Sequence, residues 1–167
     1  MILTGSEIKR CVEGGTITLD PFEFGQVNPN SYNYRLGSTL RMFSEFRDGK
    51  SYFKEIKIPK EGFILNKGQM YLARTLEKIG SNTYAMSLIG RSSLGRLGLF
   101  LQVSANLGHV GSCHCWTLEL VAAYPIRIYP GMIIGQVSFW ENYGDVEEYQ
   151  GYYGEFSNII ESNIIPI

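Results

Sequence analysis

The sequence has no marked excess of charge of either sign. Its 15 lysine and arginine residues nearly balance its 16 aspartate and glutamate residues, which gives a formal net charge of -1 at pH 7. Proteins that bind nucleic-acid polymers usually carry a clear basic excess. The charge balance therefore argues against a nucleic-acid polymer as partner, although a few local cations could still hold a small anionic ligand.

Long apolar runs and a targeting segment are also lacking. No apolar stretch approaches the roughly 20 residues that a membrane-spanning helix needs. The opening stretch MILTGSEIKR lacks the charged start and apolar centre of a signal peptide. We therefore expect a soluble, cytoplasmic protein without a membrane partner.

Cysteine is scarce, and its three occurrences do not form a disulfide framework. Cys11, Cys113 and Cys115 are odd in number and follow no framework spacing, which is typical of reduced thiols. The stretch HVGSCHC (109–115) suggests a metal site, because it gathers both histidines and two cysteines. If it leads into a strand, however, Cys113 and Cys115 point to one face and His114 to the other. The zinc-deaminase signature, His-x-Glu followed by Pro-Cys-x-x-Cys, is absent too. We expect structural cysteines and no protein-bound zinc.

Short segments rich in β-branched and aromatic residues dominate the sequence. Gly, Pro, Asn or Lys-Gly turns separate them: SYNYRLG, GFILN, QMYLARTLE, NTYAMSLIG, LFLQVSA, CWTLELVAA, IRIYPG and IIGQVSFW. One short helix is predicted near the start, where Thr4 or Ser6 can cap SEIKRCVEGG and Gly14 with Gly15 can end it. The length of 167 residues and the 44% hydrophobic content predict one domain, 1–167, of mainly β sandwich, jelly-roll or barrel type.

The stretch GRSSLGRLGL (90–99) combines arginine, serine and glycine before an apolar segment. Guanidinium groups, hydroxyls and free amides are the groups that hold phosphate in proteins. A surface loop can also be polar for solubility alone. The stretch by itself leaves both interpretations open.

Glu119, in the segment WTLELV, is a second candidate. In a strand it shares a face with Thr117, while Trp116, Leu118 and Leu120 take the other face. Periodicity alone favours a solvent-facing carboxylate on a half-buried sheet. A functional role requires that this face looks into a cleft, where partial desolvation suits a carboxylate to proton transfer.

Five motifs occur in a fixed order: GRSSLGRLGL, QVSANLGHVG, WTLEL, YPGMIIGQVSFW and YQGYYG. Their order and spacing resemble the dCTP deaminase branch of the trimeric dUTPase-like fold. That family has GRSSL-x-RLGL, V-[ST]-A, TLEL, PGM-x-IGQ-x-x-F and KYQGQ-G in the same order. NPNSYNYRLG is similar to its P-x-SYDLRLG, and MILTGSEIKRCVEGG to its opening helix. The resemblance implies a distorted β-barrel or jelly-roll with a short N-terminal helix and a flexible C-terminal tail at about residues 145–167.

The resemblance also implies a nucleotide site at each subunit interface of a homotrimer. Arg91 and Ser93 would hold phosphates of a deoxycytidine nucleotide. Magnesium would enter only as the counter-ion of those phosphates. Further contacts to the nucleotide are implied for Asn106, Gln136, Tyr143 and Gln150.

The implied chemistry is a hydrolytic deamination. Ser92 and Arg96 would face the cytosine and the catalytic carboxylate. A water held by Ser92 and by the carbonyl of Ala105 would attack C4 of the ring. Glu119 would take its proton and pass it to N3 and then to the departing amine, so that ammonia leaves and a uracil nucleotide remains.

The chain departs from the family pattern at several positions. His109 and Ser112 stand where the family has the aspartate and tryptophan of I-D-P-G-W. A dUTPase needs that aspartate to activate the water that attacks the α-phosphate, so deamination is favoured over diphosphate hydrolysis. Glu148 replaces the phosphate-facing lysine of KYQGQ, Tyr152 replaces its final glutamine, and Asn33 replaces the aspartate of SYDLRLG.

Three functional hypotheses follow. The leading one is a homotrimeric enzyme that converts dCTP, or a closely related cytosine deoxynucleotide, to dUTP and ammonia. The second is a dUTP diphosphatase or a bifunctional deaminase-diphosphatase, which His109 argues against. The third is a homologue that binds nucleotide without turnover, which Glu119 argues against.

Overall fold

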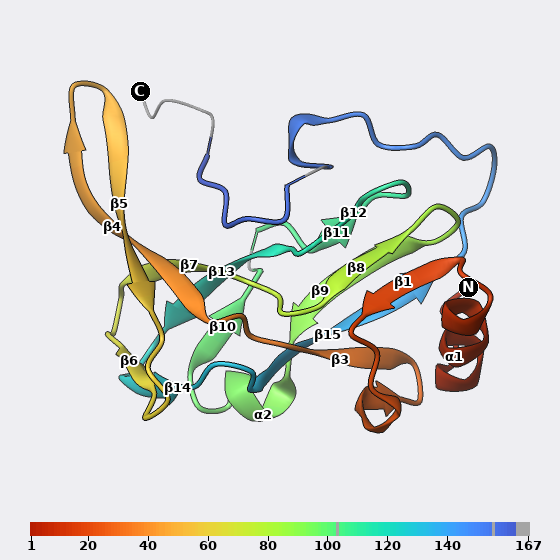
Figure 1. Cartoon of the computed structure of the whole chain (residues 1–167), viewed down its shortest axis with the longest axis horizontal. Coiled ribbons are helices and arrows are strands. Elements are labelled where there is room, and N and C mark those ends of the chain that lie inside the picture. Colours follow the sequence, from red (N-terminus) through yellow and green to blue (C-terminus); the bar gives the residue numbers. More distant parts are fainter. Residues whose placement is uncertain (103, 155, 163–167) are drawn as a thin grey trace.

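Strands dominate the computed structural model, which describes residues 1–102, 104–154 and 156–162 (Figure 1). The strands are β1 (Ile17–Asp20), β2 (Val27–Asn28), β3 (Ser31–Arg35), β4 (Thr39–Arg47), β5 (Lys50–Lys57), β6 (Phe63–Leu65), β7 (Met70–Arg74), β8 (Lys78–Ser81), β9 (Ala85–Gly90), β10 (Leu99–Leu101), β11 (Leu107–Gly108), β12 (Cys113–His114), β13 (Thr117–Ala122), β14 (Ile126–Ile128) and β15 (Ile133–Trp140). The helices are α1 (Gly5–Glu13), α2 (Ser92–Gly95) and the 3-10 turns η1 (Phe24–Gln26) and η2 (Tyr152–Gly154). No helix in the described ranges is long and apolar enough to cross a membrane.

Helix α1 is the helix that the sequence predicts near the start. Its N-cap is Thr4, whose hydroxyl accepts a hydrogen bond from the amide of Glu7 at 3.4 Å. Its C-cap is Gly14. Ile8 and Cys11 are buried on its inner face, as the apolar spacing predicts.

Antiparallel pairing organises the strands into four sheets. Two sheets have five strands each, in the orders β10-β13-β7-β4-β5 and β11-β9-β15-β3-β2. A three-stranded sheet, β1-β8-β12, and the pair β14-β6 complete the structure. Each of these strand orders is open, so pairing in the described part of the chain does not close a continuous barrel. The fold is mainly β with a short N-terminal helix, as expected.

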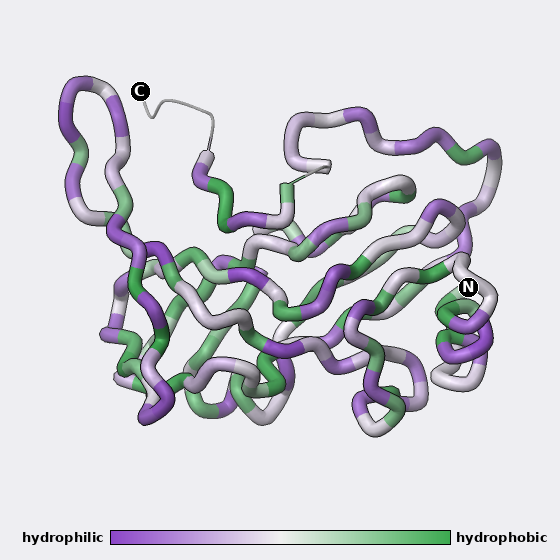
Figure 2. Tube along the Cα trace, viewed as in Figure 1, coloured by the Kyte–Doolittle hydropathy of each residue, from purple (hydrophilic) through white to green (hydrophobic). Residues whose placement is uncertain are grey.

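One cluster of buried side chains forms the core. Tyr32, Tyr34, Tyr71 and Phe139 are its largest fully buried members. Figure 2 shows that apolar segments lie mainly in the body of the molecule, below the hairpin of β4 and β5. Burial of this apolar surface is the main favourable contribution to folding.

The long hairpin of β4 and β5 is absent from the segments that the sequence pattern predicts as strands. It turns at Asp48 and Gly49, which both have positive φ angles, 52° and 73°. This is the Asp-Gly signal of a two-residue hairpin. The outer half of the hairpin is exposed, so its strands lack the apolar alternation that a buried face imposes.

Strand β13 alternates between buried and half-buried side chains. Leu118 and Leu120 are fully buried, whereas Thr117 and Glu119 are half-buried on the outer face. This confirms the predicted division of the strand. Trp116 lies just before the strand and is partly buried against the core cluster that contains these leucines. Its indole N–H donates to the carbonyl of Ile79 at 2.9 Å.

The C-terminal segment crosses over the outer face of β13. The amide of Tyr149 donates to the carbonyl of Val110 at 2.9 Å, and the amide of Ile160 donates to the Thr117 hydroxyl at 3.2 Å. In Figure 1 this segment, in blue, runs along the upper edge of the molecule. Residues 155 and 163–167 of the predicted tail lie outside the described residues.

Candidate active site

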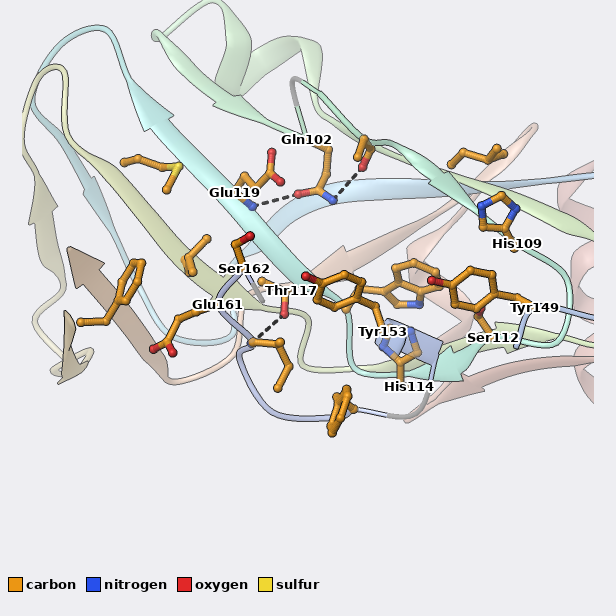
Figure 3. A pocket seen from close by; sticks show the side chains of 18 residues that line it. Gln102, His109, Ser112, His114, Thr117, Glu119, Tyr149, Tyr153, Glu161 and Ser162 are labelled. Carbon is orange, nitrogen blue, oxygen red and sulfur yellow. Dashed lines mark hydrogen bonds between the residues drawn. The ribbon is translucent and has the colours of Figure 1, made fainter. Parts of the chain in front are cut away.

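Glu119 lines a pocket of about 520 Å³ on the outer face of β13 (Figure 3). Strand β7 and the loop after β10 provide the floor and one side. The C-terminal segment provides the other side, with Tyr149, Tyr153 and Phe156 among the lining residues. The cleft that a functional role of Glu119 requires is therefore present.

Ala105, the predicted holder of the attacking water, lines the same pocket. The side chain of Gln102 connects the two positions. Its Oε1 accepts a hydrogen bond from the backbone amide of Glu119 at 2.8 Å, and its Nε2 donates to the carbonyl of Ala105 at 3.2 Å. The structure thus places a carboxylate and a backbone carbonyl around one space, which suits them to hold and deprotonate a water.

Gln102 was missed by the sequence analysis. A possible signal is its position directly after the strand Leu99–Leu101, where a polar residue interrupts the apolar segment LFLQV. Ala105 lies in the same motif as Gln102, QVSANLGHVG, but Glu119 lies in another one, and spacing does not show that the side chain of Gln102 bonds to both.

Two of the departures from the family pattern also line the pocket. His109 is exposed, and its ring stacks on Tyr149 with centroids 5.1 Å apart and planes 10° apart. Ser112 is buried at the base of the pocket. The C-terminal segment thus packs directly on the position where the resembling family has an aspartate.

The stretch HVGSCHC does not run as one strand into β13. Cys113 and His114 form β12, which pairs with β8, and Cys115 and Trp116 separate it from β13. The prediction that Cys113, His114 and Cys115 alternate along one strand leading into β13 is therefore wrong. In the part of the chain that the structure describes, no cluster of three or more His, Cys, Asp or Glu side chains is placed to hold a metal ion.

His114 is a buried group at the edge of the pocket. Its ring stacks on Trp116 at 4.3 Å, and its Nδ1 lies 3.2 Å from the carbonyl oxygen of Cys115. Burial lowers the pKa of His114 below its ordinary value of 6.5, because the charged imidazolium loses solvation. The native state therefore favours the neutral ring.

A second, adjoining pocket of about 570 Å³ shares His109 and Tyr149 with the first. Two predicted nucleotide ligands, Tyr143 and Gln150, line this pocket rather than the Glu119 pocket. Glu148 lies there too, with its side chain against Gly111. Tyr152 is exposed on η2 and lines neither pocket.

The predicted phosphate-binding stretch forms α2, with Arg91 as N-cap and Arg96 as C-cap. Ser92, Ser93 and Arg96 are exposed and Arg91 is half-buried. None of the four lines either described pocket. Helix α2 lies at the lower edge of the molecule in Figure 1, whereas the C-terminal segment follows the upper edge. Within one chain, this stretch therefore does not line the Glu119 pocket.

Two remaining predicted ligands also lie outside both pockets. Gln136, on β15, accepts a hydrogen bond from the hydroxyl of Ser31 at 2.7 Å and lies in register with Asn33 on β3. Asn106 donates to the hydroxyl of Ser87 at 3.2 Å. Both side chains have protein partners within this chain.

The comparisons with known proteins agree on one family. The profile of the dCTP deaminase-like family matches residues 2–142. A "dCTP deaminase, dUMP-forming" of Cytophaga hutchinsonii is 43% identical over 90% of this chain and 88% of its own length. A protein of the same name from Clostridium acetobutylicum is 42% identical over 95% of this chain and 91% of its own length.

A solved structure has the same fold. The 2'-deoxycytidine 5'-triphosphate deaminase of Agrobacterium tumefaciens superposes with a TM-score of 0.69 at 22% identity. The match covers 84% of this chain but only 48% of the solved chain, so the chain spans about half the length of that structure. At this identity the likeness concerns the fold alone.

Proposed function

The chain belongs to the dCTP deaminase-like family, and on this premise we propose that it hydrolyses dCTP to dUTP and ammonia. The observation that carries the proposal is the shared pocket of Glu119 and Ala105. Two relatives that are more than 40% identical, and that align over nearly their full length, carry the name "dCTP deaminase, dUMP-forming". A role in nucleotide binding without turnover would not require a half-buried carboxylate in this place.

In the proposed reaction, Glu119 is the general base and then the general acid. A water bound to the Ala105 carbonyl gives one proton to Glu119 as its oxygen adds to C4 of the cytosine. Glu119 passes this proton to N3, and a further proton transfer lets the exocyclic amine leave as ammonia when its bond to C4 breaks. The new C4 oxygen becomes the carbonyl of uracil.

The groups that complete the site are proposed to come from a second subunit of a homotrimer. Ser92 would hold the water from the opposite side, and Arg96 would position the carboxylate and stabilise its charged form. Arg91 and Ser93 would hold phosphates. The exposed side chains of α2, which lie away from the Glu119 pocket of their own chain, support this arrangement.

The proposed product keeps its triphosphate. His109 occupies the pocket position at which the diphosphatases of this superfamily use an aspartate, and an imidazole stacked on Tyr149 replaces that carboxylate. The names of the two relatives, which specify dUMP formation, favour a second candidate function, in which dUTP is hydrolysed further. Magnesium is proposed to act through the phosphates of the substrate, and the cytoplasm is the proposed location.

The test is incubation of the purified protein with dCTP, dCDP, dCMP and dUTP in the presence of magnesium, with ammonia and pyrophosphate measured separately. We expect ammonia and dUTP from dCTP in equal amounts, without pyrophosphate from dCTP or dUTP. Equal amounts of ammonia and pyrophosphate from dCTP would establish the dUMP-forming function instead. Nucleotide binding without ammonia release would contradict deamination.

A further inference from the structure

Gln102 has a backbone conformation that few residues other than glycine adopt. Its φ angle is 49°, in the left-handed region, where a residue with a Cβ atom is disfavoured. Such strain persists only where surrounding contacts hold it, and it occurs preferentially at functional sites. In Gln102 the contacts are made by its own side-chain amide, which has a partner at each end.

Both partners belong to the proposed reaction centre. The amide oxygen of Gln102 holds the backbone N–H of Glu119, and its amide nitrogen holds the carbonyl of Ala105. Figure 3 shows the side chain of Gln102 next to Glu119, with dashed lines marking both hydrogen bonds. The backbone amide of Gln102 also lies 3.3 Å from the carbonyl of Glu119, so the residue contacts β13 through two bonds.

The Ala105 carbonyl needs this support, because it lies on an exposed loop between β10 and β11. The far end of the loop is fixed by the carbonyl of Asn106, which accepts from the amide of Leu88 at 2.8 Å. Between that bond and β10, the bond from Gln102 sets the direction of the Ala105 carbonyl. A carbonyl oxygen has two lone pairs, so one remains for a water.

We propose that Gln102 is a positioning residue that fixes the Ala105 carbonyl relative to Glu119 and thereby sets where the attacking water is held. The inference rests on the proposed deamination. It assigns to Gln102 no contact with the nucleotide. Loss of the amide should therefore reduce turnover more than binding, since small misplacements of reacting groups are costly in rate.

The first test compares Gln102→Met with wild type. Methionine is unbranched and of similar length but makes neither hydrogen bond. We expect kcat for ammonia release to fall by about 10-fold to 100-fold, with the Kd of dCTP changed by no more than about twofold. Gln69→Met is the matched control, because the Gln69 amide bonds the adjacent Met70 carbonyl and does not line the pocket.

The second test uses the pH profile of Gln102→Glu. A charged carboxylate at this position can accept from the Glu119 amide but cannot donate to the Ala105 carbonyl. Protonation restores a donor. The ratio of the kcat of this variant to that of wild type should therefore rise as the pH is lowered from about 8 to about 5, whereas the ratio for Gln102→Met should stay constant. A purely structural role would not produce this difference.

A third measurement does not depend on activity. Hydrogen exchange of the Glu119 amide should be faster in Gln102→Met than in wild type, while exchange of core amides is unchanged. If wild type releases ammonia and Gln102→Met has the same kcat, the positioning role is overturned. Unaltered hydrogen exchange of the Glu119 amide in Gln102→Met would overturn it too. Absence of ammonia release from wild type would instead contradict the proposed function, and the exchange result would still decide whether Gln102 fixes this strand.

Discussion

Among single residues, replacement of Glu119 should separate the chemical step from nucleotide binding most strongly. Glu119→Gln keeps the shape and the hydrogen-bonding reach of the side chain but removes the base. We expect ammonia release from dCTP to fall by about 10²-fold to 10⁴-fold, the range typical of general acid–base catalysis. The Kd of dCTP, measured by calorimetry, should change little.

The matched control for this substitution is Glu55→Gln. Glu55 is an exposed carboxylate on β5 that pairs with Arg41 at 3.5 Å and does not line the Glu119 pocket. Its replacement should leave ammonia release as in wild type. Unchanged turnover in Glu119→Gln would remove Glu119 from the mechanism.

His109 should control the fate of the product. His109→Asp introduces, at this position of the pocket, the aspartate of the resembling family, and the resemblance implies that this carboxylate activates water for diphosphate hydrolysis. We expect this variant to release pyrophosphate from dCTP in addition to ammonia, whereas wild type releases ammonia alone. Chromatography of the nucleotides should then show dUMP. A variant that still yields only dUTP would show that residues other than His109 decide the product.

His114 should make stability depend on pH. Because burial lowers its native pKa below 6.5, the unfolded chain binds a proton that the native state does not. The free energy of unfolding should therefore be highest above about pH 6.5, fall as the pH drops through this value, and level off below the native pKa. Urea titrations at several pH values should show that the free energy of unfolding depends less steeply on pH in His114→Gln than in wild type. If the free energy of unfolding changes equally with pH in both proteins, groups other than His114 cause the pH dependence.

The residue-scale predictions from sequence differ in how well they could be made. The face of Glu119 follows from two-residue periodicity, and the structure confirms that Glu119 shares the half-buried face of β13 with Thr117. The catalytic role of Glu119 follows from the family resemblance and stays a prediction. Gln102 could not be predicted, since its role depends on a left-handed turn and on two partners in separate segments. The start of β13 at Thr117, with Trp116 outside the strand, is also not visible in the sequence.

At the scale of elements, strand β15 has a glycine, Gly135, where the buried ring of Tyr34 packs directly against its backbone. A Cβ atom on Gly135 would overlap the phenol ring of Tyr34 on β3. Tyr34 cannot easily move, since it is fully buried and donates to the carbonyl of Ile89 at 3.0 Å. Gly135→Ala should therefore lower the free energy of unfolding by about 1–3 kcal/mol, the usual cost of overpacking.

Gly25 offers the matched control, because a Cβ atom there meets nothing within 4 Å. Gly25→Ala should change the free energy of unfolding by less than about 0.5 kcal/mol, as exposed substitutions generally do. Urea titration of both variants makes the comparison. Equal effects at the two positions would mean that the contact with Tyr34 is not what constrains β15.

Elements with a buried face were the easier ones to predict. Helix α1 has a cap, an apolar stripe and a terminating glycine, and all three lie where the sequence suggests. Strands β4 and β5 were not recognised, because their outer halves are mostly exposed and no buried face imposes a period of two on them. The order of the strands within each sheet could not be read from the pattern either, since pairing joins segments far apart in the chain.

At the scale of the whole molecule, one chain contains only part of the proposed site. Glu119 and Ala105 share a pocket, whereas the predicted phosphate-binding residues of α2 lie away from it. Sequence motifs give the residues of a site but not the chain that supplies each one. In the proposed reaction, Arg96 of one subunit therefore serves the Glu119 of another.

Mixing two inactive variants tests this arrangement most directly. Glu119→Gln and Arg96→Ala should each release almost no ammonia from dCTP alone. After the two are denatured together and refolded in equal amounts, random assembly should place an intact Glu119 beside an intact Arg96 in about a quarter of the sites. We predict that ammonia release recovers to about a quarter of the wild-type rate. A mixture that stays as inactive as its components, although both variants assemble and bind dCTP, would contradict a site shared between subunits.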